Sequence, residues 1–256
     1  MQKFLANLNL FIRKSSESKN HMNIFDEQKT RMYKKFRNKI KYKNKEKITK
    51  ILHHSKSQIF QDIFVLNELN FKKNGFFVEF GATNGIDFSN SYLLEKYFSW
   101  NGILAEPSKK WHKDLSRNRS VDIDYQCVWK ETGEMLLFNE TEIGEISTID
   151  YFTNSDQFSE ARRNGKRYEV NTISLVDLLD KYKAPKIIDY LSIDTEGSEW
   201  EILQVFDFDK YKFRVITCEH NYSSKRKLIH NLLSSHGYKR KYKKLSKFDD
   251  WYILED

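Results

Sequence analysis

Apolar and polar positions alternate along this chain in two different periods. Short apolar runs, typical of strands, lie at 76–80, 102–107, 122–129, 186–194 and 213–221. Apolar residues at helical spacing mark four segments between these runs, at 89–98, 108–118, 174–182 and 198–206. Strands separated by helices are typical of parallel βαβ units, in which helices cover both faces of the sheet. The pattern therefore predicts an α/β fold.

The end of the chain breaks this alternation. A helical segment at 225–237 is followed by two strand-like segments, 238–246 and 249–256. Neighbouring strands joined by a turn pair antiparallel. A mostly parallel seven-stranded sheet that ends in an antiparallel C-terminal hairpin is the outline of a Rossmann-like class I methyltransferase. The segment from Lys130 to Val170 lacks a clear period, and we expect an irregular insertion there.

Charge divides the chain near residue 56. Residues 1–56 hold sixteen Lys and Arg against four Asp and Glu, whereas residues 57–256 have a net charge of −4. Within 29–50, apolar residues recur among the cations at loosely helical spacing. We therefore expect a basic, largely helical N-terminal extension over 1–56 and a folded domain over 57–256. The extension is either a solvated helix packed by its few apolar residues or a surface attracted to anionic lipid or nucleic acid.

Two further features bear on the cellular compartment. The first residues, MQKFLANLNLFIRK, are too short and too polar for a membrane span and lack the cleavage site of a signal peptide. Cys127 and Cys218 lie in apolar runs without the spacing of a disulfide framework or metal site, so we expect buried free thiols. Both features predict a cytoplasmic protein, and the basic extension leaves contact with a membrane surface open.

The first strand-like run ends in a glycine-containing turn, FFVEFGATNG. In open α/β sheets, ligands bind where the first strand meets the first helix through such a turn. The spacing here differs from the Gly-x-Gly-x-x-Gly pattern that cradles a pyrophosphate. A carboxylate beside the turn would repel a phosphate and suits a cofactor with an ammonium and a sulfonium, as in S-adenosylmethionine. We expect cofactor contacts from Glu79, Gly81, Thr83, Asn84 and Gly85, although Glu79 is alternatively a structural carboxylate that holds the turn.

Three more residues are candidates for binding the nucleoside part of this cofactor. Glu106 ends the second run, GILAEP, 21 residues beyond Gly85. A carboxylate at this tip is placed to accept both ribose hydroxyls, although an isolated glutamate at a strand end is also an ordinary solvated residue. Gln126 and Cys127 end the third run, where we expect the edge of the adenine.

The fourth run, IIDYLSID, leads into TEGSEWEIL. Asp194, Glu196, Gly197 and Glu199 form an Asp-x-Glu-Gly-x-Glu motif. With SQIFQD, VEFGATNG and LAEP in the same order, this motif resembles the FkbM family of S-adenosylmethionine-dependent methyltransferases from about residue 57 to the C-terminus. The resemblance implies O-methylation, commonly of a sugar or polyketide-type hydroxyl. We expect an acceptor in a surface glycan or a related precursor, in polysaccharide biosynthesis, and a helix-stabilising role for Glu199.

Transfer to a hydroxyl needs a general base or a metal, because a neutral alcohol is a poor nucleophile. His220, at the end of the fifth run, is the natural base by its ordinary pKa. Asp194 and Glu196 are further catalytic candidates, and Asp194 is also expected to contact the cofactor. Asp194, Glu219, His220 and Asn221 resemble in kind the oxygen-rich ligands of magnesium-dependent O-methyltransferases, without matching them residue by residue. The sequence leaves a divalent metal open without favouring it.

Two other functional classes remain open at this point. An RNA methyltransferase would use the basic extension to hold phosphates, but the domain is net acidic and lacks an Asn-Pro-Pro-Tyr-type motif, so nucleic acid is not an expected partner. A non-catalytic adaptor would keep the fold, but the cofactor motifs look intact. The acceptor is expected to be a small molecule or glycan, bound by the insertion. Cations there, which either hold a phosphate or form a solvated turn, are Arg162, Arg163, Lys166 and Arg167.

Overall fold

The computed structural model describes residues 30–40 and 42–255. Expectations that concern residues 1–29, including the absence of a membrane span at the start of the chain, lie outside this part. Among the helices of the described residues, none combines the length and the apolar character that a bilayer crossing requires.

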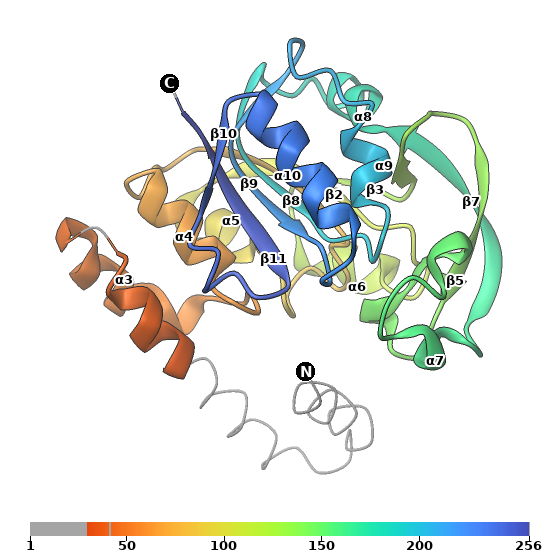
Figure 1. The fold of residues 1–256 in the computed structure, drawn as a ribbon, viewed down its shortest axis with the longest axis horizontal. Helices are drawn as coiled ribbons and strands as arrows, with labels where there is room; N and C mark the ends of the chain where they lie inside the picture. Colours follow the sequence, from red (N-terminus) through yellow and green to blue (C-terminus); the bar gives the residue numbers. More distant parts are fainter. Residues whose placement is uncertain (1–29, 41, 256) are drawn as a thin grey trace.

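A seven-stranded sheet forms the centre of the molecule, with the strand order β10-β11-β9-β8-β1-β2-β3 (Figure 1). The strands are β1 (Phe76–Phe80), β2 (Asn101–Ala105), β3 (Asp122–Asp124), β8 (Ile187–Ile193), β9 (Lys212–Glu219), β10 (Tyr238–Lys241) and β11 (Asp249–Leu254). The neighbouring strands β9, β8, β1, β2 and β3 pair in parallel, whereas β11 pairs antiparallel with both β9 and β10. The predicted Rossmann-like class I methyltransferase fold, with an antiparallel C-terminal pair, is confirmed.

Helices cover both faces of this sheet. They are α4 (Gln61–Glu68), α5 (Tyr92–Phe98), α6 (His112–Asn118), α8 (Leu175–Lys181), α9 (Glu199–Leu203) and α10 (Lys225–Ser235). Neighbouring residues of a strand point to opposite faces. Phe77 of β1 accordingly packs in the cluster that contains residues of α4, α5 and α6, whereas Val78 packs in the cluster of α8, α9 and α10. Two apolar cores, one on each side of the sheet, hold its strand ends in place.

The described part of the N-terminal extension is largely helical. Residues 30–37 are helical, and three short elements follow, η1 (Tyr42–Asn44), α3 (Lys45–Ile51) and η2 (Leu52–His54). Met32, Phe36 and Ile40 are buried in the same cluster as residues of α4 and β11. The Phe36 ring meets Trp251 of β11 edge-on, with 5.9 Å between ring centroids. The described part of the extension therefore packs on the domain through its apolar residues, and most of its cations are exposed.

The insertion is not irregular, so the expectation for 130–170 is wrong. It belongs to a second sheet of order β4-β7-β5-β6, which Figure 1 shows at the opposite end of the molecule from α3. Its elements are β4 (Cys127–Trp129), β5 (Met135–Glu140), η3 (Gly144–Ile146), β6 (Thr148–Ile149), η4 (Asp150–Phe152), α7 (Ser159–Arg162) and β7 (Lys166–Ser174). β5 and β7 pair antiparallel along the whole of β5. A separate apolar cluster, which includes Phe138, Ile149 and Phe152, stabilises this sheet.

The third predicted strand also needs correction. The run 122–129 divides between the two sheets: β3 ends at Asp124, and β4 begins at Cys127. The backbone N–H of Gln126 donates to the Asp124 carboxylate at 2.9 Å, within the bend that carries the chain from one sheet to the other. Cys127 and Cys218 are buried and unpaired, as predicted.

Candidate active site

A cavity lies beyond the carboxyl ends of β1, β2, β8 and β9. Its polar side carries carboxylates from the tips of these strands, among them Glu106, Asp194 and Glu219. Its apolar side comes largely from the second sheet and the loops around it, with Val128 and Phe138 as examples. The second sheet thus completes a site that the open end of the main sheet alone would leave exposed.

The glycine-containing turn shapes the floor of this cavity. Gly81 has a φ of +71°, and a β-carbon at this position would lie 2.0 Å from the backbone oxygen of Asp194. Only glycine therefore allows the ends of β1 and β8 to approach this closely. Gly81 and Thr83 line the cavity, whereas Asn84 and Gly85 are not among its lining residues. The Asn84 side chain instead accepts the backbone N–H of two following residues, 86 and 87, and so holds the turn.

Glu79 is held by the segment that leads into α5. Its carboxylate accepts hydrogen bonds from the backbone N–H of Asn90 at 2.6 Å and from the hydroxyls of Ser89 and Ser91. The guanidinium of Arg119 lies 3.8 Å away. Glu79 borders the cavity, but these contacts join β1 to the segment before α5, as expected for a structural carboxylate.

Glu106 is held in place by two backbone donors. One oxygen accepts from the N–H of Thr83 and the other from the N–H of Ser108, both at 2.8 Å. Burial raises the pKa of Glu106 to about 7, and the two backbone donors oppose this shift. Because a carboxylate has about four acceptor positions, both oxygens can accept one further hydrogen bond from the cavity. This geometry suits a pair of neighbouring hydroxyls.

Gln126 does not line the cavity. Its side-chain amide donates to the carbonyl of Thr172 at 3.1 Å and accepts from Lys181 at 3.3 Å, and it is not among the lining residues. Cys127 and Val128 of β4 line the cavity instead. Sequence reasoning missed most of this apolar wall, because the strands that carry it lie in a segment without a clear period.

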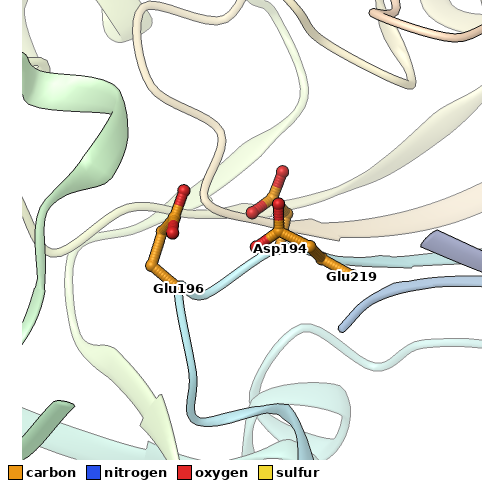
Figure 2. A group of neighbouring side chains, drawn as sticks. All are labelled: Asp194, Glu196 and Glu219. Atoms are coloured by element: carbon orange, nitrogen blue, oxygen red, sulfur yellow. The ribbon is translucent and has the colours of Figure 1, made fainter. Parts of the chain in front are cut away.

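Three carboxylates converge at the ends of β8 and β9. Asp194 directly follows β8, Glu219 ends β9, and Glu196 lies in the turn before α9 at a φ of +58°. Each offers an oxygen, and these oxygens all lie within 4.8 Å of one another. Figure 2 shows Asp194 and Glu219 side by side with Glu196 across from them. We call these three residues the acidic cluster.

The members of the acidic cluster differ in their partners. Glu196 accepts from the guanidinium of Arg162 at 2.7 Å and from the side-chain amide of Asn221 at 3.2 Å. Glu219 is buried, and within the described part of the chain its Oε2 atom has no hydrogen-bond partner. Burial raises the pKa of Asp194 to about 7 and holds the pKa values of Glu196 and Glu219 well above their ordinary range. Protonation of the cluster is therefore set by desolvation.

Glu199 holds the loop before α9, whereas the sequence indicated that it stabilises the helix itself. Its carboxylate accepts from the backbone N–H groups of Thr195 and Gly197, at 3.1 and 3.0 Å. These bonds fix the turn that carries Glu196 and begin α9. The Asp-x-Glu-Gly-x-Glu motif thus combines two residues of the acidic cluster with the glutamate that holds their loop.

His220 does not reach the cavity. Its Nδ1 accepts from the backbone N–H of Tyr222 at 3.0 Å, and its Nε2 lies 3.9 Å from a carboxylate oxygen of Asp250. Burial lowers the pKa of His220 to about 4. Neighbouring side chains along an extended segment point to opposite faces. Because Glu219 faces the cavity, His220 lies on the other side and is not placed to take a proton from an acceptor there.

A family model described as methyltransferase FkbM domain matches residues 79–240. A search of curated proteins finds no match. Among solved structures, precorrin-6y C5,15-methyltransferase from Geobacter metallireducens is 12% identical, with 75% of this chain and 85% of that chain covered and a TM-score of 0.39.

Two further solved structures show a similar degree of likeness. A SAM-dependent methyltransferase from Aquifex aeolicus is 10% identical, with coverage of 82% of this chain and 98% of that chain and a TM-score of 0.37. Ribosomal protein L11 methylase from Lactobacillus delbrueckii is 9% identical, with coverage of 76% of each chain and a TM-score of 0.39. These scores are low, and the fold assignment rests on the strand order of the main sheet.

Proposed function

The chain belongs to the FkbM methyltransferase family and is an S-adenosylmethionine-dependent methyltransferase, and from this premise we propose that it methylates a hydroxyl group of a sugar. The observation that carries the proposal is the acidic cluster, which stands in the cavity where an acceptor would meet the cofactor. Carboxylates accept hydrogen bonds from hydroxyl groups and can take up their protons.

The lining of the cavity fits S-adenosylmethionine. Glu106 would hold the two ribose hydroxyls, Gly81 and Thr83 would border the methionine part, and the apolar wall around Val128 would cover the adenine. The cofactor supplies an electrophilic methyl carbon: as an acceptor oxygen bonds to it, the carbon–sulfur bond breaks, its electron pair stays on sulfur, and the hydroxyl proton is released. The chain's own residues must orient the acceptor oxygen and remove that proton.

Asp194 is the best placed residue for this proton. It lies in the cavity, and its pKa of about 7 allows it to change protonation state near neutral pH. Glu196 is held by the guanidinium of Arg162, whose charge only partly opposes the rise in its pKa caused by burial. We therefore assign proton uptake to Asp194 and acceptor positioning to Glu196, and we assign no catalytic role to His220.

The charge of the cavity favours a sugar over a nucleic acid. Carboxylates from four strand ends face it, and in their ionised form they would repel the phosphates of an RNA backbone. A polyol, by contrast, brings several hydroxyl donors that suit carboxylate oxygens. A precursor of a surface glycan is the acceptor class that best agrees with this lining.

The basic extension supports contact with an anionic surface. Met32 and Phe36 face the domain, while Lys34, Lys35 and Arg37 on the same helix are exposed. This arrangement would direct cations toward anionic lipid and bring the cavity near a lipid-linked acceptor. Co-sedimentation with anionic vesicles that weakens as salt is raised would support this part, and equal binding to neutral vesicles would contradict it.

The proposal is tested by transfer of a labelled methyl group from S-adenosylmethionine to a panel of nucleotide sugars and lipid-linked glycans, with RNA included. We expect label on a sugar oxygen. Asp194→Asn should lower kcat by about 100-fold or more, whereas His220→Gln should keep kcat close to the wild-type value. Label on RNA alone, or full activity of the Asp194→Asn variant, would overturn the proposal.

A further inference from the structure

The acidic cluster contains three carboxylates, whereas proton uptake requires only one. We propose that Asp194, Glu196 and Glu219 together bind one divalent cation with a preference for oxygen ligands, such as Mg²⁺ or Mn²⁺. The existence of this site is independent of the acceptor, and only its role in methyl transfer rests on the proposed function.

The distances between the carboxylate oxygens fit a shared ion. Two ligands of one ion can be separated by at most twice the metal–oxygen distance, which is about 4.2 Å for Mg²⁺ and about 4.6–5.2 Å for Ca²⁺. The ligand oxygens of the acidic cluster lie within 4.8 Å of one another. This separation lies within the limit for Ca²⁺ and exceeds the limit for Mg²⁺ by about 0.6 Å, so the carboxylate oxygens must move closer together to bind Mg²⁺.

An unpaired oxygen points to a missing ligand. Glu219 is 7% exposed and lines the cavity, and within residues 30–40 and 42–255 its Oε2 atom finds no hydrogen-bond donor. Buried carboxylate oxygens are normally satisfied, because an unsatisfied one loses its hydration without compensation. A cation between β8 and β9 would satisfy this oxygen, and Asp194 stands beside it for the same ion.

The charge balance leads to the same conclusion. Arg162 is shared between Glu196 of the acidic cluster, at 2.7 Å, and Asp156, at 2.9 Å. If all three carboxylates of the cluster are ionised, at least two negative charges remain, which a divalent ion would offset. The ligands are all oxygens, and neither histidine nor cysteine belongs to the cluster. This ligand set favours Mg²⁺, Mn²⁺ or Ca²⁺ over Zn²⁺ or Cu²⁺.

Such an ion would deepen the proposed function. An acceptor hydroxyl bound to it would become more acidic and would be held in one orientation toward the methyl carbon. The carboxylate oxygen of Asp194 that does not bind the ion would remain available for the proton. The cation would thereby activate an alcohol in a cavity to which the described residues contribute no histidine.

The test measures metal binding directly. The full chain, treated with chelator and then saturated with S-adenosylhomocysteine, is titrated with Mn²⁺ and the free ion is followed by electron paramagnetic resonance. This thioether carries no sulfonium charge, so it leaves the acidic cluster without that counter-charge. We expect one saturable Mn²⁺ per chain, displaced by Mg²⁺, and a loss of affinity of about tenfold or more in Glu219→Gln.

A matched control is available on the neighbouring helix. Glu201 of α9 pairs with Lys225 at 2.8 Å and does not line the cavity, so Glu201→Gln should bind Mn²⁺ like the wild type. Circular dichroism checks that both variants are folded. Absence of saturable binding to the wild type, or equal binding by Glu219→Gln, would overturn the cation site. Because this readout needs no acceptor, it stands whether or not a sugar is methylated.

Discussion

Replacement of Arg162 by methionine would remove the buried cation that joins the second sheet to the acidic cluster. The guanidinium is fully buried and donates to the carbonyl of Ile146 at 2.7 Å, to Asp156 at 2.9 Å and to Glu196 at 2.7 Å. Methionine keeps an unbranched apolar stem of similar length but no donor. The change therefore removes the charge and hydrogen bonds while it preserves much of the packing.

The expected loss follows from the partners left behind. Removal of one member of a buried ion pair typically costs about 3–5 kcal/mol, because the other charge stays buried without compensation. Glu196 can escape this penalty by taking up a proton, since burial already raises its pKa. The folded variant would then bind a proton that the unfolded chain lacks, so its stability falls as pH rises. We expect a loss of about 3–5 kcal/mol at mildly alkaline pH and a smaller one at mildly acidic pH.

Urea denaturation followed by tryptophan fluorescence measures this loss. The neighbouring Arg163 provides the control: it pairs with Glu160, and both side chains are at least 70% exposed. Arg163→Met should change the free energy of unfolding by no more than about 0.5 kcal/mol. If Arg162→Met loses less than about 1 kcal/mol, or shows no pH dependence, the reasoning about an uncompensated buried charge is refuted.

Two further predictions concern the turn and the ribose site. Gly81→Ala should lower the free energy of unfolding by at least about 2 kcal/mol in urea denaturation, because its β-carbon would meet a backbone oxygen at 2.0 Å. Gly133 has a φ of +88° and open space around it, so Gly133→Ala should lose only about 1 kcal/mol. Equal losses in the two variants would contradict this. Calorimetric titration should show S-adenosylmethionine binding tighten as pH rises through about 7, because ionised Glu106 is the better acceptor for ribose hydroxyls. Glu106→Gln should bind about tenfold or more weakly, a difference of about 1.4 kcal/mol, and without this pH dependence; an unchanged profile would argue against ribose contact.

The main sheet could be predicted from local pattern because most of its parallel strands are buried on both faces. β8 is apolar at five of its seven positions and buried at six, so an apolar run and a strand coincide. The positions of Glu106 and Asp194 at the site could be predicted from the same strand pattern. Both lie at the carboxyl end of such a strand, and that end forms the ligand-binding edge in this class of fold.

The second sheet could not be predicted, because its strands lack that contrast. β5 exposes Met135 and Leu137, which read as core residues, and β7 begins with charged residues that pair in register with β5. The sheet is stabilised by one small apolar cluster of its own and by Val128 and Ile173, which pack in the core of the main sheet. The break after Asp124 arises because the first half of the run pairs with β2 and the second half with β7. Local sequence does not determine these pairings.

The sequence favoured His220 as the base, but Glu219 faces the cavity, and the reason is again what packs around the strand. Along β9, Val215 packs in the cluster of α4 to α6, whereas Ile216 and Cys218 pack in the cluster of α8 to α10. Both faces of the strand are therefore apolar, and the alternation shows only that Glu219 and His220 point in opposite directions. Which direction opens into the cavity is decided by what covers each face beyond the strand end. On the histidine side that cover includes Asp250 of β11, whereas the glutamate side meets Asp194, so the residue with the more favourable ordinary pKa is enclosed and the acid remains in the site.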